Sequence, residues 1–282
     1  MKNFCLLVLI LILSACRPSA PVSTPNSVIT TQAPPATQTP LPTPTITLTP
    51  VPTVERPIPT ATKASFSVCS PLAEETFETL PLILINPLDI PGFGQDTGHH
   101  GVDFAYFRRG ERESIEGIEI YAILSGKTVL TLDDDIPYGY TVLIETPLSD
   151  LPQDLQETLL AGYLPVPQDP DYRLFCPEVI PPDLTGEFSV YHLYAHMQLR
   201  PAFNSGDSIP CGSILGTVGS TGYSSNPHLH LETRLGPAGA AFTTMAHYEN
   251  TNTLEQMSNY CLWRMSGYYQ LFDPTLLFDA GE

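Results

Sequence analysis

Residues 216–232 read GTVGSTGYSSNPHLHLE. The glycines of the first half indicate sharp turns, whereas the second half alternates polar and apolar side chains, as a half-buried strand does. Residues two apart in a strand point to the same face, so His228 and His230 project side by side while Leu229 and Leu231 pack behind them. Two imidazoles on one face suit a metal site or a proton-transfer site, although two hydrogen-bonded structural histidines would give the same pattern.

Short strand patterns separated by turns recur along the chain before this stretch, at residues 102–107, 118–132, 140–145 and 187–197. This spacing predicts a mainly β fold: an antiparallel β-sandwich or open barrel core with a groove. Period two places His192, Tyr194 and His196 on one face of the strand at 187–197. Residues 66–90 are mixed in character and are expected to wrap onto an edge of the domain.

Two segments exceed this core. Residues 146–186 interrupt the strand rhythm and are predicted to be a loop-rich insertion on the rim of the sheet. Within it, residues 150–160 are predicted to form a short helix capped by Ser149 or Asp150. Residues 237–282 are less regular and are predicted to be a C-terminal extension.

The composition limits the function. The 282 residues suffice for one good-sized domain with appendages, predicted at residues 65–282. Twelve Lys and Arg against 30 Asp and Glu give a formal net charge of −18. Nucleic-acid binding needs a basic face, so nucleic acid is not expected as a partner. The sequence leaves the oligomeric state open.

Residues 1–15 indicate export. A short positive start precedes an apolar run from Phe4 to Leu13, which is shorter than the roughly 20 residues that span a bilayer and suits the core of a signal peptide. Small residues then directly precede Cys16. This resembles the lipobox of bacterial lipoproteins, which implies cleavage before Cys16, a lipid on its sulfur, and an extracytoplasmic protein anchored to a bacterial membrane. The alternative is an ordinary signal peptide, in which Cys16 is incidental.

Residues 16–64 are predicted to be a lipidated cysteine followed by a linker rich in Pro and Thr. Such a composition offers too little apolar surface to form a core. Proline biases the chain to an extended conformation, which makes the segment a semi-rigid stalk. A stalk on a lipid anchor suits a protein that acts at a distance from the membrane, for example on the cell wall.

Four cysteines fall in the predicted domain: Cys69, Cys176, Cys211 and Cys261. An even number in an exported domain, without a C-x-x-C motif, favours disulfides over zinc ligation. Three pairings are possible. Cys69 and Cys211 flank the β core, whereas Cys176 and Cys261 belong to the two added segments, which need covalent staples. Cys69–Cys211 with Cys176–Cys261 is therefore the favoured pairing.

Three motifs now stand together in the chain: H-x-G-x-D at 99–103, Y-A-H at 194–196 and H-L-H at 228–230. In this order they resemble the zinc endopeptidases of the lysostaphin and LytM type, peptidase family M23. The resemblance covers most of residues 92–145 and 187–236, which is nearly all of the predicted β core.

The resemblance implies that His99, Asp103 and His230 are zinc ligands, and that His196 and His228 are catalytic. Two histidines and one carboxylate form a typical three-ligand catalytic zinc set, which leaves a coordination position for a water with a pKa lowered towards about 7. Because the chain has no H-E-x-x-H, a histidine would accept the water proton or stabilise the oxyanion. The division of these two roles between the catalytic histidines stays open.

The remaining histidines of the predicted domain, His100, His192 and His247, match none of the three motifs. They are interpreted as packing residues, surface residues or residues that support the site. His100 is the foremost candidate for a supporting role because it is next to a predicted ligand.

The implied function is that of a zinc metalloendopeptidase that hydrolyses peptide bonds in peptidoglycan stems or cross-bridges. A non-catalytic module that binds cell wall or activates an amidase is an alternative, expected to have lost zinc ligands. Another extracellular zinc peptidase, acting on proteins or on D-Ala-D-Ala stems, is a third hypothesis. Because two segments exceed the minimal core, substrate preference does not transfer from the family. The cleaved bond, the anchoring membrane and any activating partner stay open.

Overall fold

One antiparallel sheet forms the centre of the computed structural model, which describes residues 66–280. Its strands are β1 (Leu84–Asn86), β2 (Val102–Phe104), β4 (Gly126–Asp135), β5 (Gly139–Pro147), β6 (Phe188–Met197), β7 (Ser208–Ile209), β9 (Leu229–Pro237) and β10 (Gln270–Leu271). They lie in the order β1-β2-β9-β6-β5-β4-β7, with β10 also paired to β9. The prediction of a mainly β, antiparallel fold is thus confirmed.

Smaller elements surround this sheet. A second, two-stranded sheet pairs β3 (Glu119–Tyr121) with β8 (Ile214–Thr217). The helices are α1 (Gln153–Gly162), α2 (Leu254–Arg264) and α3 (Thr275–Phe278), and short 3₁₀ turns occur at Leu80–Leu82 and Leu148–Asp150.

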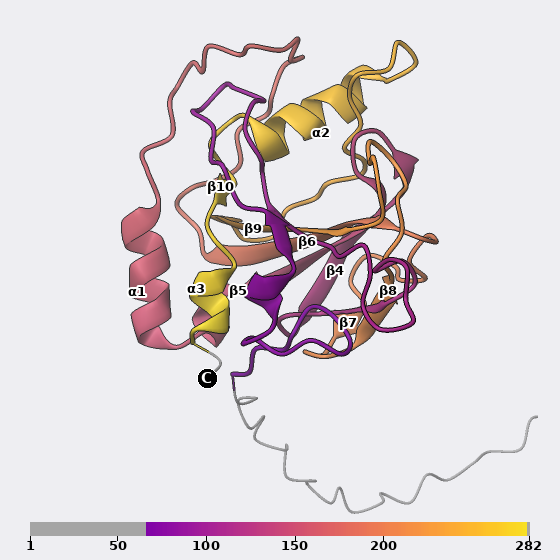
Figure 1. Cartoon of the computed structure of the whole chain (residues 1–282). Coiled ribbons are helices and arrows are strands. Elements are labelled where there is room, and N and C mark those ends of the chain that lie inside the picture. The colour runs from indigo at the N-terminus through magenta and orange to yellow at the C-terminus, as the bar shows by residue number, and fades with distance from the viewer. Residues whose placement is uncertain (1–65, 281–282) are drawn as a thin grey trace, which may run out of the picture. The chain divides into compact units, whose positions relative to one another are not determined.

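The two faces of the large sheet bury separate cores. On one face, residues of β3, β8, α1 and α3 pack against alternate strand residues such as Tyr194 and Leu231. On the opposite face, α2 contributes Tyr260 and Trp263, which pack with Leu193 of β6 and its neighbours. Figure 1 shows α2 on its own side of the sheet, away from α1 and α3. The period-two alternation of the strands therefore supplies both cores.

The helices differ in part from the sequence expectation. The helix predicted in the insertion exists, but it begins at Gln153 after Pro152, so the predicted caps at Ser149 and Asp150 were wrong. The preceding residues form a 3₁₀ turn instead, and proline is well tolerated at the start of a helix. Helix α2 was not predicted, although Thr253 and Gln256 form a capping box at its start.

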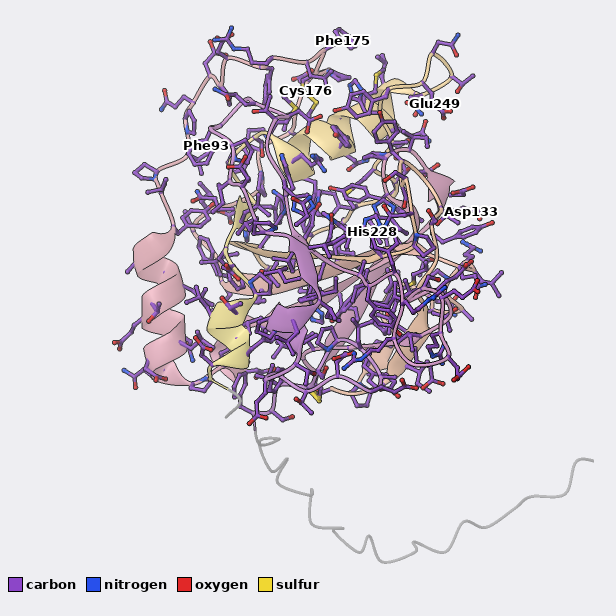
Figure 2. All side chains as sticks on the ribbon, in the orientation of Figure 1. Phe93, Asp133, Phe175, Cys176, His228 and Glu249 are labelled. Carbon is purple, nitrogen blue, oxygen red and sulfur yellow. A yellow bond between two sulfur atoms is a disulfide. The ribbon has the colours of Figure 1, made fainter. Side chains whose placement is uncertain are left out.

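The N-terminal part of the domain behaves as expected. Residues 66–90 first run beside β3 of the small sheet, where Leu72 bridges to Ile120, and then contribute β1, the edge strand of the large sheet, which pairs with β2. The structure contains the disulfides Cys69–Cys211 and Cys176–Cys261, and Figure 2 shows Cys176 beside α2. Among the described residues, no helix is both long and apolar enough to cross a membrane. The predicted signal peptide, Cys16 and the linker lie outside the described residues.

Candidate metal centre

The register between β2 and β9 creates the centre of the site. Asp103 of β2 lies directly opposite His230 of β9. Gly101 makes this approach possible, because a Cβ there would lie 2.5 Å from the carbonyl oxygen of Leu231 and 2.9 Å from the His230 ring. The glycine of H-x-G-x-D is therefore needed for close contact between the strand and the histidine opposite.

The three predicted ligands come together at one carboxylate oxygen. His99 Nε2 lies 3.1 Å from Asp103 Oδ1, and His230 Nδ1 lies 2.8 Å from the same oxygen. All three ligand atoms lie within 4.8 Å of one another. Two atoms bound to one tetrahedral zinc at about 2.0–2.2 Å are about 3.3 Å apart. The donor set and its spacing therefore fit a zinc ion after small shifts.

Hydrogen bonds to other atoms fix His99 and Asp103 in this orientation. Nδ1 of His99 donates to the carbonyl oxygen of Pro87 at 2.9 Å, which leaves Nε2 as the ligand atom. Nδ2 of Asn86 donates to Oδ2 of Asp103 at 3.1 Å, which leaves Oδ1 facing the two histidines. Both partners lie on or directly after β1, so the edge strand positions two of the three ligands.

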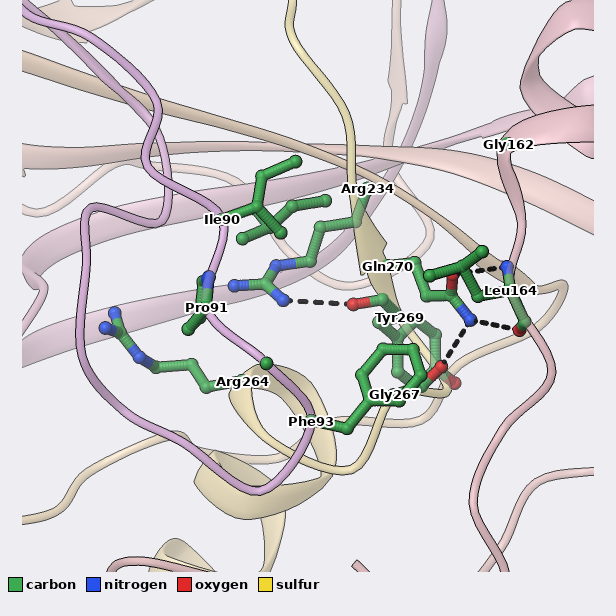
Figure 3. Close-up of a pocket in the computed structure, with 12 residues that line it drawn as sticks. Ile90, Pro91, Phe93, Gly162, Leu164, Arg234, Arg264, Gly267, Tyr269 and Gln270 are labelled. Carbon is green, nitrogen blue, oxygen red and sulfur yellow. Dashed lines mark hydrogen bonds between the residues drawn. The ribbon is translucent and has the colours of Figure 1, made fainter.

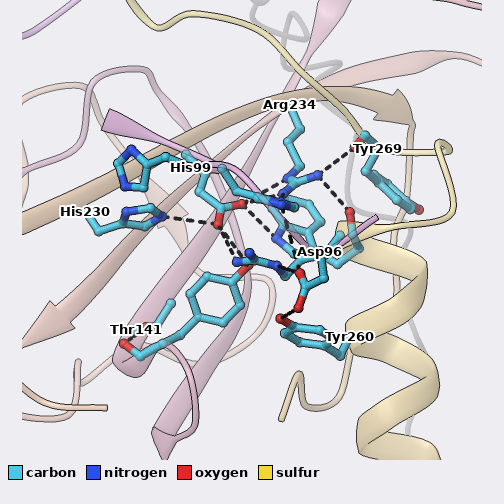
Figure 4. A network of polar contacts seen from close by, with 12 residues as sticks. Asp96, His99, Thr141, His230, Arg234, Tyr260 and Tyr269 are labelled. Carbon is cyan, nitrogen blue, oxygen red and sulfur yellow. Dashed lines mark hydrogen bonds and ion pairs between the residues drawn. The ribbon is translucent and has the colours of Figure 1, made fainter. Parts of the chain in front are cut away.

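A buried carboxylate fixes the third ligand. Nε2 of His230 lies 3.2 Å from Oε1 of Glu232, so its Nδ1 faces Asp103. Glu232 is fully buried and also accepts hydrogen bonds from the Tyr138 hydroxyl at 2.8 Å, Arg234 Nε at 2.9 Å and Trp263 Nε1 at 3.0 Å. Figure 4 shows part of this network, which reaches from the site to Arg234.

The charges in this cluster shift its titration. Burial opposes ionisation of Asp103 and Glu232, but hydrogen bonds and neighbouring positive charges outweigh burial and hold the pKa of both carboxyl groups well below its ordinary range. Burial likewise opposes protonation of His230, yet its bonds to the same two carboxylates raise its pKa to about 9. Both carboxylates are thus charged at neutral pH, and a cation between them is favoured.

The two predicted catalytic histidines face the ligands. Nδ1 of His196 lies 2.8 Å from the carbonyl oxygen of Thr221, and Nδ1 of His228 lies 2.8 Å from that of Asn226. Because each Nδ1–H donates to a carbonyl, each Nε2 keeps its lone pair as a base. The two ring centroids are 4.7 Å apart, and Nε2 of His228 lies 3.6 Å from Oδ1 of Asp103. Burial and the two neighbouring histidines lower the pKa of His196 to about 3, which keeps it neutral.

The expectation that His192, Tyr194 and His196 share one face was wrong for His196. Tyr194 packs into the core on the β3–β8 side, and His192 bonds to its hydroxyl. His196 has a φ of +61°, in the left-handed region, and its ring lies against His228 and His230 on the opposite face. A local break in the β5–β6 register accompanies this change, because left-handed backbone ends the strict alternation of a strand.

The other three histidines of the domain are all buried, and none lies on the surface. His192 bonds to Thr146 within the core, and His247 Nε2 donates to the carbonyl oxygen of Phe175. His100 supports the network beside the site, because its Nδ1 accepts a hydrogen bond from Arg234 at 3.0 Å. Burial and nearby arginines lower its pKa to about 2.

Sequence reasoning missed several residues of the site. They are Asn86, Asp96, Tyr138, Glu232, Arg234, Trp263 and Arg264. One signal was available: the alternation that begins at His228 continues through Glu232 and Arg234, so these side chains had to share the face of the histidines. The others lie outside the three motifs, and their sequence gave no comparable sign.

The predicted ligands and catalytic histidines line a groove of about 290 Å³. Its lining consists of His99, Asp103, Pro137, Tyr138, His196, Tyr223, Ser224, Ser225, His228, His230 and Arg264. The glycine-rich loop before the H-L-H motif supplies Tyr223, Ser224 and Ser225, so this loop forms one wall.

Comparison with protein families gives one match. Residues 184–242 match the model of peptidase family M23. The matched segment contains His230 and both predicted catalytic histidines, whereas His99 and Asp103 lie before it. The match therefore does not reach the first two predicted ligands. No curated protein matches this chain.

Several solved structures resemble the chain at low identity. A putative M23 peptidase from Pseudomonas aeruginosa is 18% identical over 78% of this chain and 57% of its own length, with a TM-score of 0.32. The catalytic domain of lysostaphin from Staphylococcus simulans is 19% identical over 73% and 99%, with a TM-score of 0.35. A putative glycyl-glycine endopeptidase from Ruminococcus gnavus is 14% identical over 64% and 46%, with a TM-score of 0.32. Likeness at this level carries no weight for function.

Proposed function

We propose that this protein is a zinc-dependent endopeptidase that hydrolyses peptide bonds in the stems or cross-bridges of peptidoglycan. The proposal rests above all on one observation: the ligand nitrogens of His99 and His230 meet at Asp103 Oδ1, and the rings of His196 and His228 lie beside them with Nδ1 bonded to backbone carbonyls. The family match over residues 184–242 supports the same reading.

His99, Asp103 and His230 would hold the metal, because their ligand atoms converge and their remaining polar atoms are already bonded. A zinc ion held by three protein ligands lowers the pKa of a bound water towards about 7 and polarises a carbonyl group. The hydrogen bond from His230 to Glu232 increases the basicity of the ligand and keeps the ring in place.

His196 and His228 would handle protons and charge. Each presents Nε2 to the groove, so each can accept a proton from an attacking water and later donate it to the leaving amine. When protonated, the same group stabilises the negative charge that develops on the carbonyl oxygen. The two backbone carbonyls that bind Nδ1 hold these rings ready for either step.

The proposal includes a location and an organisation of the chain. We infer that residues 1–15 are a signal peptide, that Cys16 carries lipid, and that residues 16–64 link this anchor to the catalytic domain at 65–282. The support is the apolar run before Cys16 and the Pro/Thr-rich composition after it. This arrangement would hold an extracytoplasmic enzyme at a bacterial membrane, within reach of the wall.

A non-catalytic wall-binding or amidase-activating module is the main competitor. Loss of a ligand would favour it, but all three predicted ligands are present and brought together. Digestion of purified peptidoglycan, with mass analysis of the products, separates the two. We expect new peptide fragments that disappear with a chelator and return with zinc. Binding to the wall without any new fragment would support the module instead.

A further inference from the structure

Helix α2 brings an arginine to the edge of the metal groove. The helix lies after the segment that matches the M23 family and within the predicted C-terminal extension. Its last residue is Arg264, which lines the groove together with the metal ligands and both predicted catalytic histidines. An element outside the matched segment therefore contributes to the groove.

Arg264 is held rigidly from one side. Its Nε donates to Oδ1 of Asp96 at 2.8 Å, and its Nη1 donates to the Tyr138 hydroxyl at 3.2 Å. The guanidinium also lies over the rings of Tyr138 and Tyr260, 5.7 and 5.4 Å from their centroids. Its side chain is only 13% exposed. A cation fixed in this way loses little conformational entropy when it binds a further group.

The guanidinium keeps donors for a further partner. Of its five N–H groups, those of Nη2 make no hydrogen bond with any described residue from 66 to 280. Arg264 also borders a second pocket of about 300 Å³, where its guanidinium extends away from Leu164 and Gln270 (Figure 3). Arg264 thus borders both the metal groove and this second pocket.

The nearby carboxylates are already saturated by other donors. Asp96 also accepts hydrogen bonds from the hydroxyls of Tyr260 and Tyr248 (Figure 4 shows Asp96 and Tyr260). Glu232 accepts bonds from four other residues and lies 3.7 Å from Arg264 Nη1. Neither acid needs the open donors, so Arg264 can offer them to an anion from outside.

We infer that Arg264 is a specificity residue that binds a free carboxylate of the substrate close to the scissile bond. It lies 3.7 Å from Glu232, which is 3.2 Å from the ring of the ligand His230. Since an extended chain advances about 3.3–3.6 Å per residue, the carboxylate belongs to a residue next to the cleaved bond or one further along. This inference rests on the proposed function and deepens it: the enzyme acts on acidic stem peptides rather than on neutral oligoglycine.

A matched pair of probes tests this assignment. One is a cross-linked dimer of the stem peptide L-Ala-γ-D-Glu-diaminopimelate-D-Ala with free carboxylates, and the other is the same dimer with carboxamides in their place. Hydrolysis is measured as kcat/KM, and binding as Kd in a His196→Ala background that slows turnover. Each protein is compared with itself on two ligands, so partial unfolding of a variant does not alter the ratio.

The wild-type protein should prefer the acidic dimer by about 10- to 100-fold, the usual worth of a charge-assisted bond. Arg264→Gln should bring the ratio near one, and Arg264→Lys should give an intermediate ratio because a lysine cannot bind a carboxylate in two places. Arg173→Gln is the matched control, because Arg173 pairs with Asp171 outside the groove and should keep the full preference.

An unchanged preference in Arg264→Gln, or no preference in the wild type, overturns the inference. Binding of neither dimer overturns it as well. The proposed function fails separately: a wild-type protein that cleaves neither dimer, yet binds the acidic one more tightly through Arg264, supports the inference and contradicts the peptidase. Equal cleavage of both dimers would support the peptidase and overturn the inference.

Discussion

At the scale of single residues, a hydrogen bond to one ring nitrogen of each histidine determines which nitrogen is left to face the site. Backbone carbonyls occupy Nδ1 of His99, His196 and His228, so these three offer Nε2. In His230 the bond to Glu232 occupies Nε2 instead, and Nδ1 faces Asp103. Hydrogen bonds outside the groove thus set the tautomers inside it.

The change Glu232→Gln tests this dependence. Glutamine has the same shape but no charge, so the bond that orients His230 weakens and the buried Arg234 loses its partner. We expect metal affinity to fall about 10- to 100-fold and the free energy of unfolding to fall by about 3 kcal/mol. Metal titration and denaturant unfolding measure the two. Glu145→Gln, which removes a carboxylate bonded to Ser189 and Tyr191 away from the site, should keep full metal affinity; equal losses in both variants would contradict the account.

His192 predicts a pH dependence of stability that is independent of the metal. Burial lowers its pKa to about 3, below the ordinary value of 6.5. As the pH falls below 6.5 the unfolded chain binds a proton that the folded protein refuses until about pH 3. The stabilisation is therefore complete above pH 6.5 and is lost towards pH 3, by about 1.4 kcal/mol per pH unit. His192→Gln should remove this part of the slope in unfolding experiments between pH 6 and 4; parallel curves would show that His192 does not contribute it.

At the scale of elements, alternation predicted the large sheet well, because each strand separates two cores. It failed at His196, where a left-handed residue turns the side chain to the other face. Such a turn is not encoded in the polarity pattern. Helix α2 was not predicted, although the capping box at Thr253 was a readable sign.

The site, like the fold, was predictable from the sequence only in part. The three motifs contain the predicted ligands and catalytic histidines, and the structure brings the three predicted ligands together, with Asp103 opposite His230 across β2 and β9. The supporting residues could not be found in this way, since Asn86, Asp96 and Arg264 lie outside the three motifs. Their roles follow from tertiary packing, which no local pattern records.

The disulfide Cys176–Cys261 connects the insertion to α2, the element that carries Arg264. Replacing both cysteines by alanine should lower the free energy of unfolding by about 2–4 kcal/mol and reduce the preference for the acidic dimer, because α2 loses its tether. The pair Cys69→Ala and Cys211→Ala should also lower stability but leave that preference intact, since this disulfide lies away from α2. Unfolding curves measure the stability of each double variant. The ratio of kcat/KM for the acidic dimer to kcat/KM for the carboxamide dimer measures its preference. A normal ratio without Cys176–Cys261 would show that α2 holds its position unaided.

At the scale of the whole molecule, the proposed anchor and stalk would place the catalytic domain near the wall. The change Cys16→Ser removes the sulfur that lipid attachment needs. We expect the variant to appear in the soluble extracytoplasmic fraction or to remain unprocessed, whereas the wild type stays with the membrane. Cell fractionation and the mass of the mature N-terminus measure this. Unchanged partitioning and maturation of the variant would contradict the lipoprotein proposal.

Metal binding and proton transfer are expected to fall on different residues of this cluster. If His99, Asp103 and His230 hold the metal, replacement of any of them by alanine should remove metal and activity together, because two ligands hold zinc too weakly. If His196 and His228 only transfer protons and stabilise charge, their alanine variants should keep about one zinc per chain while losing roughly 10²-fold or more in rate. All five should fold, because the sheet and its two cores carry the structure.

The most direct measurement is metal content beside peptidoglycan hydrolysis for each of these variants, with His247→Ala as a control because His247 bonds to Phe175 outside the groove. We expect zinc without activity in His228→Ala, neither zinc nor activity in His230→Ala, and both in His247→Ala. Zinc retained by His230→Ala but lost from His228→Ala would reverse the two assignments. Full hydrolysis by both His99→Ala and Asp103→Ala would contradict the zinc peptidase itself.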